Sequence, residues 1–180
     1  MNIFYVHHNP HSAAMALCDK HVVKMLTESL QLLSNAHHIH GTQGFDDVLY
    51  KPTHLHHPCS KWVAATYGNY RWLWDHANAL NREYTLRYAK FHKAWNTTIF
   101  NSMNCRGYYL YTPPLALTRA NVDFYVPPMC MPDKYKLYNE PVISYRSYYI
   151  EEKSKFAKWR YTSPPDWYLE AMRKKSNVTP

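Results

Sequence analysis

The sequence predicts a mostly α-helical protein with a single domain, and three observations favour this class. Apolar residues recur at intervals of three and four over long segments, which is the spacing of a helix with one buried face. Only four glycines occur, and Gly-rich phosphate loops and Gly-x-Ser-x-Gly elbows are absent from the sequence, which argues against doubly wound α/β enzymes. A chain of 180 residues suits one core better than two. We therefore expect one helical domain over residues 1–180, built from three main helices, a short N-terminal extended segment and a long proline-rich loop.

The N-terminal part is expected to be an extended segment followed by one long helix. Residues 3–6 form a short apolar run, which predicts either a single strand or an extended lead-in. Ser12 is a typical N-cap residue, and apolar side chains recur with helical spacing after it. We expect this helix to run from Ser12 to His40 and to end before Gly41.

A second long helix is expected after a polar loop over residues 41–57. Proline in the first turn of a helix costs no hydrogen bond, so the pair His57-Pro58 predicts the start of this helix. Its pattern of aromatic and apolar residues continues to about His92, and Gly68 is the point where it is free to bend.

The C-terminal half begins with an irregular stretch. Five prolines interrupt residues 96–138, whose many tyrosines favour an ordered, packed loop insertion over a floppy one. A third helix is expected from Asn139-Glu140-Pro141 to about Trp159. A last short helix is expected after the cap at residues 163–166, and a basic tail over residues 173–180.

The charge of the chain favours an acidic partner. Lys and Arg total 21 against 13 Asp and Glu, which gives a net charge of +8. The excess is uneven, because residues 93–180 carry 13 basic and 7 acidic side chains against 8 and 6 in residues 1–92. Nucleic acid is the usual partner of such a surface. Solubility alone is the alternative explanation.

Composition also indicates where the protein resides. No apolar run approaches the roughly 20 residues that a bilayer requires, and the N-terminus has none of the features of a signal peptide. We expect a cytoplasmic protein with no membrane partner, whose four separated cysteines are thiols. The sequence does not determine the oligomeric state, and we assume a monomer.

A polar stripe on the first long helix is the best candidate for a functional site. His21, Lys24 and Glu28 are spaced by three and four residues, so they share one helical face. An acid, a base and an amine within two turns is the usual set of groups for general acid–base catalysis. A solvated polar face is the alternative, because amphipathic helices commonly carry such stripes.

A second hypothesis for the same region is a metal site. Cys18 and His21 lie one helical turn apart, and His57 and Cys59 stand at the start of the second long helix. These four side chains have the donor atoms of a tetrahedral zinc site. Their spacing matches no standard structural-zinc pattern, so the crowding of histidines before residue 93 is the competing explanation.

Two short segments resemble a known enzyme family. The stretch Asp19-Lys20-His21-Val22, with Glu28 six residues after Val22, resembles the start of the first long helix in phage pyrimidine-dimer DNA glycosylases of the endonuclease V type. Pro165-Asp166-Trp167-Tyr168 resembles the C-terminal segment of that family. The motifs Cys-Asp-Lys-His and His-Pro-Cys also resemble an uncharacterised group of phage proteins. If the protein is phage-encoded, its expected location is the cytoplasm of the host cell.

The resemblance implies an N-glycosylase, with or without abasic-site lyase activity, that removes damaged or modified pyrimidines from DNA. An amine attacks C1′ of the sugar, expels the base and forms a Schiff base, without a metal or other cofactor. In that family the amine is the N-terminal one after loss of methionine, whereas the bulky Asn2 should keep Met1 in place here. The α-amine of Met1 is then the expected nucleophile, and Lys24 or Lys20 is the alternative. Glu28 would assist ring opening, His21 would orient the sugar, and Asp19 would support them.

The resemblance and the charge together give a set of residues expected to contact DNA. Basic residues would hold phosphates, and aromatic residues would support an extruded base. Rings at helical spacing are also common core residues, so burial is the alternative for each aromatic member. The expected set is Lys20, His57, Arg71, Trp72, Tyr145, Arg146, Lys155, Trp167 and Tyr168.

Two other functions stay open at this stage. One is a zinc-stabilised module that binds nucleic acid without catalysis, through Cys18, His21, His57 and Cys59. The other is a phage protein that binds a host factor and whose basic charge is incidental. Weak nucleic-acid affinity with little dependence on salt would indicate the latter.

Overall fold

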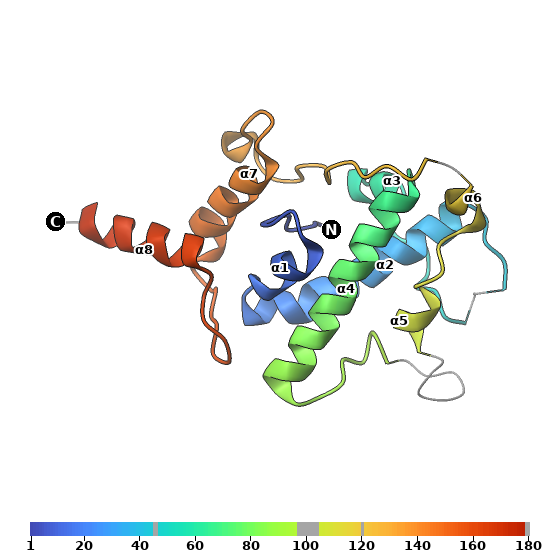
Figure 1. Ribbon diagram of the computed structural model, residues 1–180, viewed down its shortest axis with the longest axis horizontal. Coiled ribbons are helices and arrows are strands. Elements are labelled where there is room, and N and C mark those ends of the chain that lie inside the picture. The colour runs from blue at the N-terminus through green and yellow to red at the C-terminus, as the bar shows by residue number, and fades with distance from the viewer. Residues whose placement is uncertain (45–46, 97–104, 120, 179–180) are drawn as a thin grey trace.

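Helices make up the regular structure of this protein, and none of the described residues forms a strand. The computed structural model describes residues 1–44, 47–96, 105–119 and 121–178. This confirms the all-α class (Figure 1). The longer helices are α2 (Asp19–Ile39), α4 (Tyr67–Tyr88), α7 (Pro141–Tyr148) and α8 (Asp166–Val178), and the shorter ones are α1 (Pro10–Met15), α3 (Pro58–Val63), α5 (Arg106–Tyr109) and α6 (Leu115–Thr118).

The core lies mainly between α2 and α4. Figure 1 shows α4 crossing α2, and α4 also packs against α1 and α3. Leu26, Leu30 and Leu33 of α2 are fully buried, as are Leu73 and Leu80 of α4. This is the apolar face that the three- and four-residue spacing predicts, and burial of this face stabilises both helices.

The prediction of one continuous helix from Ser12 to His40 is wrong, because this segment is divided into α1 and α2. Asn9 rather than Ser12 caps α1, and its side-chain oxygen accepts the Ser12 backbone N–H at 3.0 Å. The segment before it forms no strand: residues 1–5 are irregular and residues 6–9 bend, and the Val6 N–H donates to the Phe4 carbonyl at 2.8 Å.

Side chains from distant parts of the chain hold the junction between α1 and α2. Cys18 has extended backbone angles (φ −66°, ψ 161°), and its N–H donates to the Tyr149 hydroxyl at 2.9 Å. The Arg87 guanidinium donates to the carbonyls of Met15 and Leu17, at 3.0 and 2.9 Å. These bonds satisfy backbone groups that a continuous helix would have paired locally, so the break depends on tertiary contacts.

The second predicted helix is also divided, into α3 and α4. The chain leaves the helix at residues 64–66, and the Thr66 hydroxyl then accepts the Asn69 N–H at 3.1 Å as the cap of α4. Gly68 lies in the first turn of α4 and marks no bend. A Cβ on Gly68 would lie 2.5 Å from the Asp123 carbonyl oxygen, so glycine here permits residues 121–126 to cross the start of α4.

The described part of the proline-rich loop is ordered, as predicted. It contains α5, α6 and a short 3₁₀ helix (η1, Asp133–Tyr135), while residues 97–104 and 120 lie outside the described residues. The third predicted helix is shorter than expected. It consists of α7 and a π-helical turn (η2, Tyr149–Lys153), and the chain is irregular well before Trp159.

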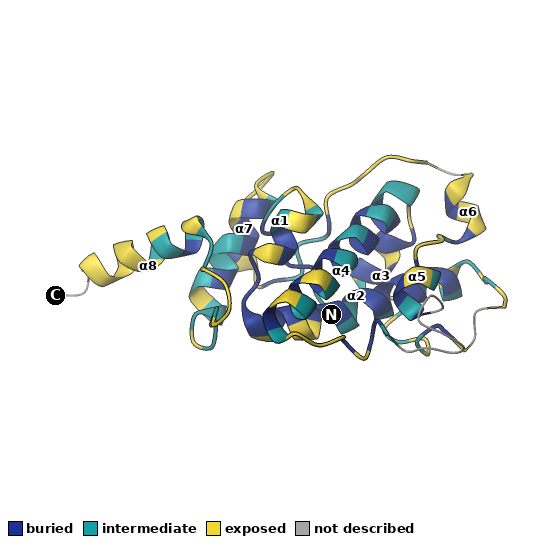
Figure 2. Ribbon diagram, turned by 60° about the horizontal axis from the view of Figure 1, so that its bottom comes forward, coloured by how far each residue is buried: buried dark blue, intermediate teal, exposed yellow. Residues whose placement is uncertain are grey.

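The last helix is longer than expected. It takes in residues 173–175, which the sequence analysis placed in a basic tail, because no proline or glycine interrupts residues 166–178. Figure 2 shows that α8 is exposed along most of its length, while its first turns pack beside η2. The segment from α7 to α8 forms a C-terminal arm beside the N-terminus (Figure 1).

Candidate active site

A cavity of about 340 Å³ lies where three parts of the chain meet. The N-terminal segment, one face of α2 and the C-terminal arm each contribute a wall. The predicted stripe of His21, Lys24 and Glu28 faces into this cavity, because their spacing places them on one side of α2. The lining residues are Met1, Asn2 and Phe4, then Lys20, His21, Lys24, Met25 and Glu28, and finally Tyr148, Lys153 and Phe156.

Glu28 joins the N-terminal segment to the stripe. Its Oε2 accepts the backbone N–H of Asn2 at 3.2 Å, and its Oε1 pairs with the Lys24 Nζ at 3.3 Å. The Glu28 side chain is 16% exposed and that of Lys24 is 65% exposed. The carboxylate is therefore held inside the cavity, while the lysine reaches into it from solvent.

The Asn2 side chain holds the N-terminal segment in place. Its Nδ2 donates to the Cys130 carbonyl at 3.0 Å, and its Oδ1 accepts the Tyr145 hydroxyl at 2.8 Å. Together with Glu28, these contacts fix residue 2 from three directions. A reacting group on the N-terminus would be positioned by the fold rather than by substrate.

His21 forms the inner wall of the cavity. Its ring stacks on Phe4 with centroids 4.5 Å apart, and the ring of Phe156 contacts it edge-on. The His21 Nδ1 lies 2.9 Å from the Tyr149 hydroxyl, which already accepts the Cys18 N–H. If the hydroxyl donates its proton to Nδ1, the imidazole proton lies on Nε2.

Burial and neighbouring charges keep His21 neutral. Burial lowers its pKa to about 3, and the positive charges of Lys153, Lys24 and Lys20 act in the same direction. The imidazole is therefore uncharged at neutral pH.

The cavity is positively charged overall. Three lysines line it, Lys20, Lys24 and Lys153. Against them, Glu28 is the one acidic residue among the described lining residues. Lys153 donates to the Tyr148 hydroxyl at 3.0 Å, and Lys20 lies 4.8 Å from the centre of the Phe156 ring. Such a surface attracts phosphate groups.

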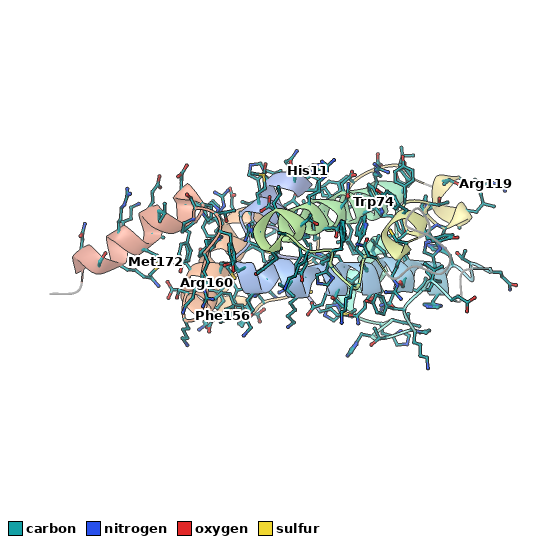
Figure 3. All side chains as sticks on the ribbon, turned by 90° about the horizontal axis from the view of Figure 1, so that it is seen from below. His11, Trp74, Arg119, Phe156, Arg160 and Met172 are labelled. Atoms are coloured by element: carbon teal, nitrogen blue, oxygen red, sulfur yellow. The ribbon has the colours of Figure 1, made fainter. Side chains whose placement is uncertain are left out.

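A second cavity of about 280 Å³ shares Lys20 and Phe156 with the first. Lys158 and Arg160 line it together with Tyr88 and Tyr161, and Figure 3 shows Phe156 and Arg160 at the same end of the molecule. Lys158 and Arg160 are not in the set predicted to contact DNA, although they follow Lys155 closely in a segment where basic and aromatic residues are interleaved.

Asp19 has a structural role rather than the predicted supporting role beside His21. Its Oδ1 pairs with the Arg87 Nη1 at 3.1 Å, and its Oδ2 accepts the Arg160 backbone N–H at 2.8 Å. These contacts fix the first turn of α2 to α4 and to the C-terminal arm. Asp19 lines the second cavity and not the first.

Three of the aromatic residues expected to contact DNA belong to the core instead. Trp72, Tyr145 and Tyr168 are 8%, 0% and 7% exposed, which leaves no ring face for a base. The Trp72 Nε1–H donates to the His8 carbonyl at 2.8 Å, and Tyr168 packs against Trp159 with centroids 4.6 Å apart. A small domain uses most of its large side chains in the core. At these three positions the rings are therefore core residues, which was the alternative to contact with DNA.

The other residues expected to contact DNA are partly used within the protein. Trp167 packs edge-on against Tyr149, the residue whose hydroxyl bonds His21. Arg146 donates to the Val6 carbonyl at 2.9 Å, and Arg71 pairs with Asp75 at 3.1 Å. Lys155 is exposed. Lys20 is the member of the predicted set that lines both cavities.

The structure does not assemble the predicted zinc ligands as a set. In the described part of the chain, the group of His, Cys and acidic residues whose donor atoms all lie within 4.8 Å of one another is His57, Cys59 and Cys130. Cys18 and His21 are not members, because His21 faces the first cavity and bonds Tyr149.

A comparison with known protein families identifies the family to which this chain belongs. The family model of the pyrimidine dimer DNA glycosylases matches residues 1–97, which is more than half of the chain. The chain belongs to this family. No curated protein and no solved structure matches it.

Membership of a DNA glycosylase family makes DNA the substrate class. The matched residues contain the N-terminal segment and α2, and thus most of the lining of the first cavity. Tyr148, Lys153 and Phe156 come from outside the match. Among the described residues, no helix is both long and apolar enough to cross a membrane.

Proposed function

We propose that this member of the pyrimidine dimer DNA glycosylase family excises damaged or modified pyrimidines through an N-terminal amine and Glu28, with cleavage of the resulting abasic site. The observation that carries the proposal is the convergence of the N-terminal segment, His21 and Glu28 on one cavity. All three lie within the residues that the family model matches.

The contacts of Glu28 favour the N-terminal amine over Lys24 as the nucleophile. Both candidates approach the carboxylate, but the N-terminal segment is fixed through Asn2 while the Lys24 side chain is largely exposed. If the chain begins at Met1, the residue that carries the α-amine lines the cavity. If methionine is removed, the amine is the Asn2 nitrogen, which lies 3.2 Å from Glu28.

The proposed chemistry balances with these groups. The amine nitrogen forms a bond to C1′, the C1′–base bond breaks, and the base leaves with the electron pair. Glu28 accepts the proton that the amine loses and transfers it to the sugar ring oxygen as the ring opens to the Schiff base. Cleavage of the strand then requires loss of a proton from C2′ and departure of the 3′ phosphate.

The remaining lining residues fit binding and orientation. The neutral His21 offers its Nε2–H to a sugar or base oxygen, and Lys20 and Lys153 offer charge to phosphates. Lys158 and Arg160 in the second cavity extend this positive surface away from Glu28. This extended positive surface is suited to bind the phosphates that flank the target nucleotide.

The test combines a conservative variant with covalent trapping. Glu28→Gln keeps the size and the hydrogen-bonding shape of the side chain but removes the base, so we expect lost turnover with retained DNA affinity. The control is Glu170→Gln, at an exposed position on α8, which should change neither. Borohydride should trap a protein–DNA adduct in the wild type, and peptide mapping should place it on the N-terminal peptide.

Two results would contradict the proposal. An adduct on the peptide that carries Lys24 would transfer the nucleophilic role to that lysine. Failure to trap any adduct on duplexes with pyrimidine dimers, oxidised or alkylated pyrimidines would exclude the Schiff-base mechanism. The mass of the N-terminal peptide shows whether Met1 or Asn2 supplies the amine.

A further inference from the structure

Three side chains with soft or borderline donor atoms meet at a site that the proposed chemistry does not use. Cys59 lies in the first turn of α3, His57 is the N-cap of that helix, and Cys130 comes from the end of the proline-rich loop. The two sulfur atoms are 3.6 Å apart, although 71 positions separate them in sequence. The three donor atoms all lie within 4.8 Å of one another.

The separation of the sulfur atoms matches that of a tetrahedral metal site. With zinc–sulfur bonds of about 2.3 Å and tetrahedral angles, two thiolates lie about 3.8 Å apart, and a thiolate and an imidazole nitrogen lie about 3.6 Å apart. The observed Sγ–Sγ distance of 3.6 Å is close to this value. The two sulfur atoms could therefore hold an ion at nearly their present separation, and His57 would complete the set by approaching them from within 4.8 Å.

His57 has a ring nitrogen that is able to bind a metal. The His57 Nδ1 accepts the Cys59 backbone N–H at 3.1 Å, so this nitrogen is unprotonated and faces the start of α3. A metal would take this lone pair in place of the capping bond. Cys59 is fully buried, whereas His57 and Cys130 are half-buried, so the site is in contact with solvent at His57 and Cys130.

Two simpler explanations account for less of this arrangement. A thiol–thiol hydrogen bond explains the Cys59–Cys130 contact, and a disulfide would need the sulfur atoms to approach to about 2.05 Å. Neither involves the His57 imidazole, which caps α3 and would be the nitrogen ligand of a Cys₂His site.

We infer that His57, Cys59 and Cys130 bind one borderline-soft divalent cation of the Zn²⁺ class. The ion would tie α3 to residues 127–131. It would also support the N-terminal segment, because the Cys130 carbonyl accepts the Asn2 side chain at 3.0 Å. His57, Cys59 and Cys130 are not among the residues that line the cavity at Glu28, so the role that we assign to the ion is structural.

Metal analysis of the full-length chain tests this inference. Protein purified without chelating resin and dialysed against zinc should retain about one equivalent of zinc. Cobalt loading should give the sulfur-to-metal charge-transfer absorption of a thiolate site. Cys59→Ala and Cys130→Ala should each lose the metal, and His57→Ala should bind it more weakly. Cys18→Ala is the matched control, since it removes a buried thiol of the originally predicted set and should keep the metal.

A second measurement does not depend on the variants folding. Alkylation of the wild-type chain, mapped by peptide, should show Cys59 and Cys130 protected with zinc and modified after EDTA, with Cys18 and Cys105 unchanged between the two conditions. Absence of zinc after loading, equal alkylation with and without EDTA, or a Cys59–Cys130 disulfide in reduced preparations would each overturn the inference. Loss of the metal in both Cys18→Ala and Cys59→Ala, with Cys130→Ala unaffected, would overturn the inference and restore the sequence-based ligand set.

Discussion

Three buried histidines should make the free energy of unfolding depend on pH. Burial is the largest cause that lowers the pKa of His21 to about 3 and the pKa values of His37 and His76 to about 4 each. In the unfolded chain each would have a pKa near 6.5. All three are therefore neutral in the folded protein at pH 7 and gain protons more readily when it unfolds.

This difference predicts that the protein loses stability in mild acid. The contribution of each histidine is complete above pH 6.5 and is lost as the pH falls toward the folded values of about 3 to 4. Each should lower the free energy of unfolding by up to about 1.4 kcal/mol per pH unit below pH 6.5. Urea denaturation at pH 7, 6 and 5 measures this. Equal midpoints over that range would show that the histidines are accessible.

Tyr149 is the residue that we expect to set the protonation of His21. Tyr149→Phe removes the hydroxyl that bonds the His21 Nδ1 and the Cys18 N–H. Loss of the buried partner should cost about 1–3 kcal/mol of stability, and turnover should fall while DNA affinity is kept. Imidazole nitrogen shifts measured by NMR should show that the proton is no longer held on Nε2.

The control for this variant is Tyr148→Phe, next in sequence, whose hydroxyl accepts from Lys153 and does not touch His21. It should leave the His21 nitrogen shifts unchanged. Unchanged shifts in Tyr149→Phe itself would refute the assigned proton position.

At the scale of elements, the ends of helices were less predictable than their buried faces. The spacing of leucines located α2 and α4 from sequence because each helix carries its own periodicity. The breaks at residues 16–18 and 64–66 were missed. At the first of them the partners are Arg87 and Tyr149, which lie far away in the chain. A helix end that is capped by a distant side chain leaves no local signal.

Arg87 is the strongest test of this account of the α1–α2 junction. Its side chain is fully buried and pairs with Glu83 at 2.8 Å and Asp19 at 3.1 Å, besides the two carbonyls at the end of α1. Arg87→Met leaves both carboxylates without their partner, so we expect a loss of about 3–5 kcal/mol in the free energy of unfolding.

Arg82→Met on the exposed face of α4 is the matched control and should change stability by about 0.5 kcal/mol or less. Chemical denaturation compares the two variants. A similar small effect of both would mean that the network around Arg87 is dispensable.

At the scale of the whole molecule, the structure shows where the positive charge of the C-terminal half lies. The sequence showed that residues 93–180 hold most of the positive excess. The structure places Lys153, Lys158 and Arg160 from this half on the cavities beside α2. The C-terminal arm therefore supplies charge to a site whose other walls come from the family-matched residues.

This arrangement predicts strongly salt-dependent DNA binding. Each phosphate contact contributes about −0.9 to the slope of log affinity against log salt concentration. Lys158→Ala and Arg160→Ala should each weaken binding to all sequences and make the slope shallower by about 1. Arg71→Ala is the control, because Arg71 pairs with Asp75 outside both cavities. Binding titrations at several salt concentrations give the slopes, and equal slopes for all variants would exclude this surface as the DNA contact.

The sequence by itself determined the helical class and the stripe of His21, Lys24 and Glu28. Both are local, because residues three and four apart on one helix share a face whatever surrounds them. Only the tertiary structure decided which groups that stripe meets. Glu28 contacts residue 2 of the chain, and His21 contacts Tyr149 from the C-terminal arm.

The same distinction explains the corrections. Cys130 joins His57 and Cys59 across 71 positions of chain, and Asp19 turns toward Arg87 rather than into the first cavity. Trp72, Tyr145 and Tyr168 are buried although they stand beside basic or polar residues in the sequence. Contacts between distant segments depend on packing of the whole chain, and a pattern that is read along one helix carries no information about them.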